Sequence, residues 1–391
     1  MAVSGCATVN VANVGQTGYA LADDERRMHK RAEEICEIID ESGHVYADAN
    51  LENYLTALAN GLLPDSAKAE HFSVTVKVLT DPTLNAFAFP NGRIYIHAGM
   101  LAAIENEAQL AALLAHETTH VLNRHALKQF RSLTNKSAFF ATFQVPLAVV
   151  GGELGSILAQ LSVISSVYGY SQELESEADS GGFAMMTEKG YDVYEAPKLF
   201  EHLEEFIKDE DVKEPFFFST HPGVAARIQN LNHFIEKNHV AAGGGKKVGA
   251  EIYQSHARDL VLKDINFCLA QGMFKTAERI LDRYVKLYPD NASGYFYKGE
   301  LYRQRQDKAK GKKERDKSGD YPIAIEAYDQ AILHDPALAQ AYQAKGRVLQ
   351  RLQKIDEAKS ALRKYLELSP QAEDREYIQQ FLSDDKRKDS L

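Results

Sequence analysis

The stretch that decides the fold covers residues 106–127 and reads NEAQLAALLAHETTHVLNRHAL. Apolar residues recur in it at helical spacing with no Gly or Pro to interrupt them, so the pattern predicts one buried amphipathic helix. This helix contains the sequence HETTH at residues 116–120. Positions i and i+4 of a helix share a face, so His116 and His120 can reach the same metal ion while Glu117 acts on water beside it. The stretch therefore predicts the H-E-x-x-H site of a zinc hydrolase.

Chance is a weak explanation for this motif. A chain of this length and composition would contain H-E-x-x-H somewhere in roughly three cases of a hundred, and a chance match would seldom fall in the middle of an apolar helix. Two histidines and a glutamate are also costly to bury without a metal ion or other partners. A metal site is therefore the better interpretation.

The third metal ligand is predicted from the acidic stretch SQELESEAD at residues 171–179, which leads into a second helix. Glu175 and Asp179 are four residues apart and share a helical face. Glu175 can therefore complete a His/His/Glu site, and Asp179 can hydrogen-bond a ligand imidazole. Glu173 or Glu177 fits the ligand position by composition alone, and acidic residues also gather at helix N-termini because of the helix dipole.

The residues before the metal-binding helix predict a small sheet. Residues 72–79 alternate valine with other residues, as a half-buried strand does. Two further strands, over 86–89 and 93–97, flank an Asn-Gly pair at 91–92 that is typical of a hairpin turn. Amphipathic helices over 23–41 and 47–62 precede the strands, and we expect them to pack on the core.

An unusually apolar stretch, residues 137–172, follows the metal-binding helix. Pro146, Glu153, several glycines and repeated Ser and Gln divide it into runs too weak to predict a transmembrane hairpin. We expect two helices here that line or cover the cleft. Their apolar faces are available to a membrane surface or to an apolar part of a substrate.

Composition sets the general class of protein. The 391 residues are 45% hydrophobic and 26% charged, which is ordinary for a soluble globular protein of two or three domains. A formal net charge of -10 argues against nucleic acid as a partner. The three cysteines, at positions 6, 36 and 268, indicate no disulfide framework.

The opening sequence MAVSGC places Cys6 after small residues. This resembles the end of a bacterial lipoprotein signal, in which the cysteine is lipidated, although the charged and apolar regions of such a signal are missing. If the true start lies upstream, the resemblance implies a membrane-anchored lipoprotein of the bacterial periplasm or cell envelope. The alternative is a free cysteine in a flexible N-terminal tether.

The C-terminal part of the chain contains a repeat. Pro336 and Pro370 are 34 residues apart, and an alanine stands twelve residues before each of them and before Pro289. This is tetratricopeptide phasing, and a polar insertion within residues 306–320 explains the longer interval from Pro289 to Pro336. Stacked helix pairs of this kind form a superhelix with a concave surface for a protein partner, or a scaffold that packs on the N-terminal part of the chain.

Four motifs, in order, carry a resemblance to a known family: NAFAFPNGRIYIHAGML, LLAHETTHVLNRH, ELESEAD and STHPGVAARI. They resemble the motifs of the bacterial HtpX/BepA-type metallopeptidases and the CAAX prenyl proteases, which form peptidase family M48. The order of peptidase and repeats is most similar to the BepA-like subgroup. The resemblance implies a gluzincin-type domain in which Glu175 is the third zinc ligand and Asp179 the trailing aspartate.

The H-P-x-x-x-E-R motif of this family falls on His221, Pro222 and Arg227, but Ala226 stands where the family has Glu. The setting of Arg227 is therefore open. His221 has two candidate roles with opposite consequences. It is either a protonated donor that stabilises the oxyanion of the intermediate, or a neutral ligand that takes the fourth zinc position and displaces the catalytic water.

Two further expectations concern the surroundings of the site. The resemblance implies that the edge strand beginning at Asn85 and Ala86 pairs with extended substrate. Metzincins, a rival zinc class, require H-E-x-x-H-x-x-G-x-x-H, but no Gly follows His120, and His125 lies about 140° from it around a continuous helix. We therefore expect His125 to pack near the site and not to bind zinc.

The predicted fold is α+β and mostly helical. It comprises a tether (1–22), a gluzincin-type zinc metallopeptidase domain with a small sheet (23–240), a Gly-rich linker (241–250) and an all-α tetratricopeptide superhelix (251–391).

The predicted activity is that of a zinc endopeptidase acting on misfolded or envelope proteins. One Zn²⁺ per chain is held by His116, His120 and Glu175, and Glu117 is the general base. The repeats recruit protein partners or substrates. The alternative is an envelope chaperone or assembly factor whose zinc site is latched and rarely active.

Overall fold

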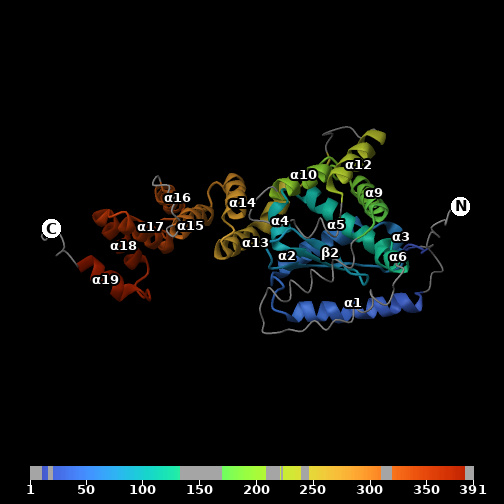
Figure 1. The fold of residues 1–391 in the computed structure, drawn as a ribbon, viewed down its shortest axis with the longest axis horizontal. Coiled ribbons are helices and arrows are strands. Elements are labelled where there is room, and N and C mark those ends of the chain that lie inside the picture. The colour runs from blue at the N-terminus through green and yellow to red at the C-terminus, as the bar shows by residue number, and fades with distance from the viewer. Residues whose placement is uncertain are drawn as a thin grey trace, which may run out of the picture. The chain divides into compact units, whose positions relative to one another are not determined.

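The computed structural model describes residues 11–15, 21–132, 170–207, 221, 223–238, 246–309 and 319–383. The chain forms two compact units, Met1–Leu260 and Val261–Leu391 (Figure 1). The first unit contains a small sheet with helices around it, and the described part of the second unit contains helices and the turns between them. The predicted mostly helical fold with one small sheet is therefore confirmed.

The sheet has three strands in the order β1-β3-β2, which are β1 (Thr75–Leu79), β2 (Ala86–Ala88) and β3 (Arg93–His97). β1 runs parallel to β3, and β2 runs antiparallel to it. The predicted hairpin is confirmed, because Gly92 between β2 and β3 has a φ of 85°, a conformation that favours glycine. Within the described part of the chain, β2 is an edge strand.

Helices cover both faces of this sheet. The apolar stripe of α1 (Asp23–Glu41) shares a buried cluster with Phe87, Phe89 and Tyr95 of the sheet. In Figure 1, α1 lies on one side of the sheet and α5 (Glu107–Leu122) lies on the other. The metal-binding motif is therefore carried by a helix that packs directly on the strands.

The predicted single helix over residues 106–127 is wrong in one respect, because it is broken. α5 ends at Leu122. Arg124 then adopts a left-handed φ of 51°, which costs a residue with a Cβ about 1–2 kcal/mol, and α6 (His125–Ser132) follows. The Arg124 guanidinium lies 2.7 Å from a carboxylate oxygen of Glu25 on α1. A tertiary ion pair therefore supports a helix break that helical periodicity does not reveal.

α9 (Gln172–Glu188) packs closely along α5, and two glycines allow this approach. A Cβ atom on Gly181 would lie 2.6 Å from the Thr119 side chain, and one on Gly182 would lie 3.3 Å from the backbone N of His116. Both glycines come shortly after the acidic stretch, separated from it by Ser180. Their small size therefore brings the acidic stretch to the histidine face of α5.

The remaining described helices of the first unit are α2 (Ala49–Leu62), α3 (Asp65–Ala69), α4 (Ala98–Ala103), α10 (Glu195–Ile207) and α12 (Val224–Lys237). α12 packs on α9 and on α10, and α10 also packs on α5. These contacts bring the start of α12 near the region where α5 and α9 meet.

The start of α5 is anchored by the segment that precedes α13 (Ala250–Gln271). The backbone N–H groups of Glu107 and Ala108 donate to the carbonyl oxygens of Gly249 and Val248, at 3.4 and 3.0 Å. The two units divide within α13 and not in the expected linker at 241–250. The physical reason is that the residues just before α13 are hydrogen-bonded to the first unit.

The second unit contains half of α13 and six further helices in its described residues, which are α14 (Phe274–Leu287), α15 (Ala292–Ala309), α16 (Asp320–His334), α17 (Ala339–Arg351), α18 (Ile355–Leu368) and α19 (Arg375–Ser383). Successive helices pack on one another. Small residues allow close approach, since a Cβ on Gly299 would lie 2.3 Å from the Tyr328 ring. Stacked antiparallel helices are the architecture that the repeat phasing predicts.

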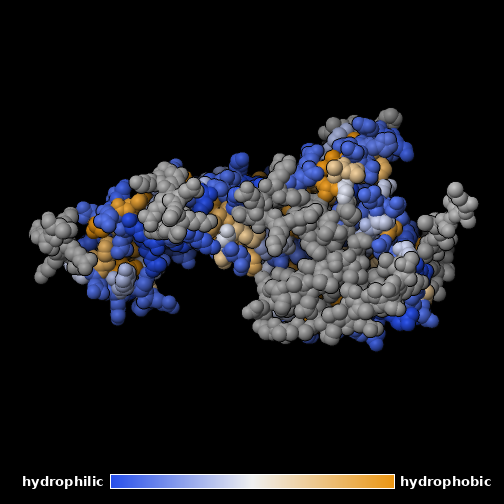
Figure 2. All heavy atoms as spheres, in the orientation of Figure 1, coloured by the Kyte–Doolittle hydropathy of each residue, from blue (hydrophilic) through white to orange (hydrophobic). Residues whose placement is uncertain are grey.

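Several predictions concern residues outside the described ones: Cys6, most of the apolar stretch at 137–172, and most of the polar insertion. Among the described helices, none combines the length and the apolar character needed to cross a membrane. On the face drawn in Figure 2, hydrophilic side chains cover much of the described surface, and hydrophobic side chains gather in small areas.

Candidate metal centre

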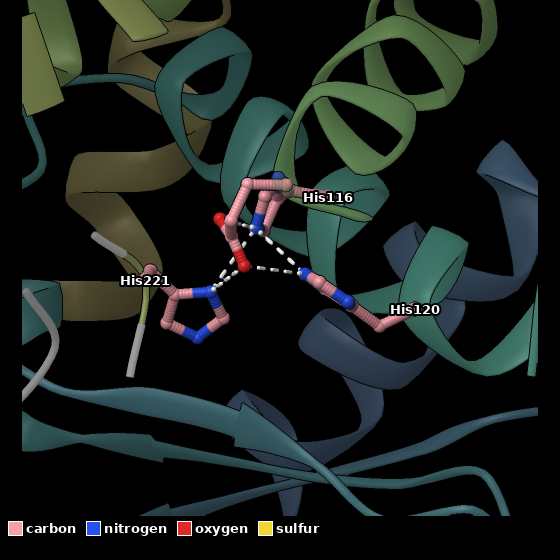
Figure 3. Close-up of side chains that lie close together, drawn as sticks. His116, His120 and His221 are labelled. Atoms are coloured by element: carbon pink, nitrogen blue, oxygen red, sulfur yellow. Dashed lines mark hydrogen bonds and ion pairs between the residues drawn. The ribbon is translucent and has the colours of Figure 1, made fainter. Parts of the chain in front are cut away.

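The two histidines of the HETTH motif face the same point. His116 and His120 lie one turn apart on α5, and their Nε2 atoms are 3.0 Å apart. Both side chains are buried. Figure 3 shows the two rings converging from the same helix, as the i, i+4 spacing predicts.

Glu175 and His221 approach the same point from other parts of the chain. Glu175, in the first turn of α9, lies 3.4 Å from His116 Nε2 and 3.5 Å from His120 Nε2. His221 Nδ1 lies 3.0 Å from Glu175 Oε1 and 3.3 Å from His116 Nε2 (Figure 3). One donor atom from each of the four side chains lies within 4.8 Å of the others.

This donor set fits a metal ion. Three imidazoles and a carboxylate converge in a buried place. Because the imidazole nitrogens are so close together, they cannot all carry protons. Glu175 Oε2 is buried and makes no hydrogen bond, and it lies 3.4 Å from both His116 Nε2 and Arg227 Nη1, so a metal ion would add a direct bond to an oxygen that has only ion-pair contacts. Histidine nitrogens and a glutamate oxygen are ligands that zinc takes in proteins.

The charge states of Glu175 and His120 suit metal binding. Burial raises the pKa of Glu175, but His221 and Arg227 lower it by more, so that it lies well below the usual range. Burial and the nearby His116 lower the pKa of His120 well below its usual value. An ionised carboxylate and a neutral imidazole are the forms that bind metals. Burial and Arg227 lower the pKa of His116, but Asp179 and Glu175 raise it by more, to about 9, so His116 must lose a proton before it binds a metal ion.

Asp179 and Arg227 support His116 from behind. Asp179 Oδ1 lies 2.9 Å from His116 Nδ1, on the opposite side of the ring from the atom that faces the cluster. Arg227, on α12, donates to both carboxylate oxygens of Asp179, at 2.6 and 3.0 Å. The guanidinium also lies 4.2 Å from the centre of the Phe200 ring. Although Ala226 stands where the family has Glu, Arg227 is still held in place by Asp179 and by the ring of Phe200.

Glu117 is buried beside the cluster and is not one of its four converging side chains. Its Oε1 atom lies 3.5 Å from His221 Nε2 and has no hydrogen-bond partner. The Glu117 carboxylate therefore lies next to the site, and its Oε1 atom can accept a proton or a hydrogen bond from another group.

The other candidate third ligands lie elsewhere. Glu177 receives hydrogen bonds from Asn123 and Lys128, at 2.8 and 3.0 Å, and faces His125. His125 and Lys128 lower the pKa of Glu177 to about 2. Glu173 is exposed at the surface of α9. The geometry brings Glu175 alone of these three glutamates to the histidines.

Two further side chains contact His120, of which sequence reasoning missed Tyr170 and expected His125 near the site. The Tyr170 ring stacks on the His120 ring, with centroids 3.9 Å apart and planes at 15°. His125 Nδ1 lies 2.8 Å from His120 Nδ1, because the helix break brings His125 back toward His120. Tyr170 could have been suspected only from its position just before the acidic stretch.

The expected substrate strand lies at the edge of the sheet in the described residues, and it is buried, with Ala86 completely so. Asn85 and Phe89 exchange backbone hydrogen bonds with β3, so the alternate residues Ala86 and Ala88 direct their backbone groups away from β3. A small cavity beyond this strand is lined by Ala88, His120 and Tyr170 among others. β2 and the histidine cluster therefore border on the same space.

A helix carrying H-E-x-x-H, a glutamate from a second helix and a small sheet define the class of gluzincin-type metallopeptidases. Residues 47–235 match Peptidase family M48, and residues 269–311 and 339–371 each match a tetratricopeptide repeat. The chain therefore contains a domain of peptidase family M48 followed by tetratricopeptide repeats. Both the recognised family and the predicted repeats are confirmed.

Three relatives illustrate the similarity. The chain is 30% identical over 165 residues to a mitochondrial metalloendopeptidase, OMA1, of Schizosaccharomyces pombe, covering 42% of this chain and 47% of the relative. It is 26% identical over 292 residues to a putative beta-barrel assembly-enhancing protease of Vibrio cholerae, covering 65% and 58%. It is 27% identical over 204 residues to the beta-barrel assembly-enhancing protease of Escherichia coli, covering 48% and 39%. The matches span about half the length of these relatives.

Proposed function

We propose that the chain is a zinc-dependent endopeptidase that cleaves misfolded or envelope proteins bound in extended form. The observation that carries this proposal is the buried convergence of His116, His120 and Glu175 within a metallopeptidase-family domain. When bound there, zinc would polarise the scissile carbonyl and lower the pKa of a water molecule.

The protein's own residues divide the remaining work. Asp179 holds the Nδ1 side of His116, which leaves Nε2 to face the metal. Arg227 balances the charge of Asp179 in the protein interior. Glu117 takes the proton of the attacking water and later delivers it to the leaving amine.

Zinc content and casein cleavage together test this function. We expect about one zinc ion per chain, and we expect a chelator to abolish cleavage and added zinc to restore it. Cleavage that resists complete metal removal would contradict the proposal, and so would a folded protein that takes up no zinc.

Glu175→Ala should reduce zinc affinity by about a hundredfold or more, because it removes a direct ligand and loss of even an outer partner costs about 10–100-fold. Zinc affinity is measured by competition with a chromophoric chelator. Glu173→Ala is the matched control, since it removes an exposed carboxylate from the same turn. If Glu175→Ala keeps full zinc affinity and Glu173→Ala or Glu177→Ala loses it, the third ligand is Glu173 or Glu177 and not Glu175.

Ala86→Pro should raise KM about fivefold without lowering zinc content. The outward N–H of Ala86 would be lost to the substrate backbone, and one hydrogen bond contributes about 1 kcal/mol. Ala86→Val is the control, because it adds a side chain of similar size and keeps the N–H. Peptide cleavage kinetics with equal KM values for all three proteins would place the substrate strand elsewhere.

A second candidate function is that of an envelope chaperone or assembly factor with a latched zinc site. The observation that favours it is the presence of His221 among the four converging donors, where it could occupy the fourth zinc position. The two functions are distinguished by whether unfolded proteins are cut by the wild-type chain. They are compatible if cleavage is released only when His221 leaves the metal.

The repeats and the cellular location complete the proposal. Tetratricopeptide repeats indicate protein–protein interaction, and we infer that they recruit a substrate or an assembly partner. The names of the bacterial relatives support a place in the periplasm or cell envelope, with Cys6 as a lipid anchor. Release of the chain into the soluble fraction without detergent would contradict that anchor.

A further inference from the structure

We propose that His125 and Glu177 form a positioning pair for His120, which fixes the proton and the orientation of its ring so that Nε2 faces the metal. The inference rests on the proposed function, because it treats His120 as a metal ligand. Neither His125 nor Glu177 belongs to the four converging side chains.

The contacts define a line of three side chains. His125 Nδ1 lies 2.8 Å from His120 Nδ1. His125 Nε2, at the other side of the same ring, lies at an ion-pair distance of 3.4 Å from Glu177 Oε2, without a hydrogen bond. His125 is completely buried. Two imidazole nitrogens at 2.8 Å form a favourable contact only when one carries the proton and the other accepts it.

Glu177 determines which nitrogen carries the proton. A carboxylate facing His125 Nε2 favours a proton on that atom, so neutral His125 has its lone pair on Nδ1. His120 must then donate through its own Nδ1. This leaves the lone pair of His120 on Nε2, the atom that lies 3.0 Å from His116 Nε2.

The pair is itself firmly held. Glu177 accepts hydrogen bonds from Asn123 and from Lys128, so its position does not depend on His125. Tyr170 stacks on one face of His120 and fixes the plane of the ring. Stacking does not fix the rotation of the His120 ring within that plane. The contact with His125 fixes it, because it holds Nδ1 of His120 toward His125.

The helix break makes the arrangement possible. On a continuous helix, residues five positions apart point about 140° away from each other. The left-handed Arg124 ends α5 and starts α6 in a new direction. The break thereby places His125 against His120. The strained backbone of Arg124 thus contributes to the arrangement of the site.

Two substitutions at His125 separate positioning from packing. His125→Leu keeps an apolar side chain of similar size and removes the acceptor, whereas His125→Asn keeps an acceptor where Nδ1 stands. We expect the Leu variant to bind zinc about 10–100-fold more weakly and the Asn variant to recover most of that loss. Glu177→Leu should also weaken binding, whereas Glu188→Gln, at the far end of the same helix, should not.

The zinc dissociation constant is measured by competition with a chromophoric chelator, on protein whose folding is checked by circular dichroism. A Leu variant with wild-type affinity would overturn the inference. Folded Asn and Leu variants with equally weakened affinity would also overturn it, because the acceptor would then have no effect.

A second measurement uses the metal-free protein and separates this inference from the proposed function. With ¹⁵N-labelled histidine, we expect ring resonances that show His120 protonated on Nδ1 in the wild type and in His125→Asn, and a mixture of tautomers in His125→Leu. A wild type that binds no zinc but shows this pattern would defeat the proposed function and leave the positioning pair in place. A proton on His120 Nε2 in the wild type would overturn the pair.

Discussion

Glu117→Gln should lower casein cleavage by about a hundredfold to ten-thousandfold, the range for a positioned general base, while the protein keeps its zinc. Glutamine has nearly the shape of glutamate but cannot take a proton from water. Glu117 lies beside the four converging donors and is not one of them, so its replacement removes no ligand. Initial rates of cleavage and zinc content are measured on the same preparations.

Glu173→Gln is the matched control for this change, since it makes the same substitution at an exposed position of α9. It should cleave casein at the wild-type rate. Undiminished cleavage by Glu117→Gln would rule out the mechanism. Loss of zinc together with activity would instead make Glu117 a contributor to metal binding.

His221→Phe should increase cleavage by about 10-fold to 1000-fold if a minor, open state of the wild type carries the activity at about 0.1–10% of the population. His221 Nδ1 lies 3.0 Å from Glu175 and 3.3 Å from His116. A neutral imidazole in this position could take the fourth place on zinc and exclude the catalytic water. Phenylalanine fills a similar volume and offers no ligand.

The alternative role for His221 predicts the opposite sign. A protonated His221 that stabilises the oxyanion would make His221→Phe slower by about a hundredfold or more. Turnover of a peptide substrate, measured with zinc in excess, decides between the two. A variant with unchanged turnover and an unchanged zinc environment would contradict both roles. His233→Phe, at an exposed position of α12, is a control that should not alter turnover.

The secondary structure of the first unit was largely predictable because it follows local periodicity. The helix at 23–41 and the hairpin around Gly92 are found where the sequence places them. The break at Arg124 was not predictable, because the residues around it favour a helix and the contact with Glu25 that supports the left-handed turn spans a long stretch of chain.

The site was predictable only in part. Two histidines four residues apart on an apolar helix must share a face, so their convergence is a property of the helix itself. The choice among three nearby glutamates is not such a property. It depends on how α9 is rotated and how closely it approaches α5, and the approach is set by Gly181 and Gly182.

The sequence by itself therefore determined the HETTH face of α5, the strands of the small sheet and the phasing of the C-terminal repeats, because each follows from spacing along one segment. Only the tertiary structure decided that Glu175 reaches the histidines, that Arg227 pairs with Asp179, and that His221 joins the cluster. The contact between His125 and His120 likewise depends on the tertiary structure. These contacts join different helices, so they depend on close packing and on ion pairs between residues far apart in the chain, which local periodicity does not encode.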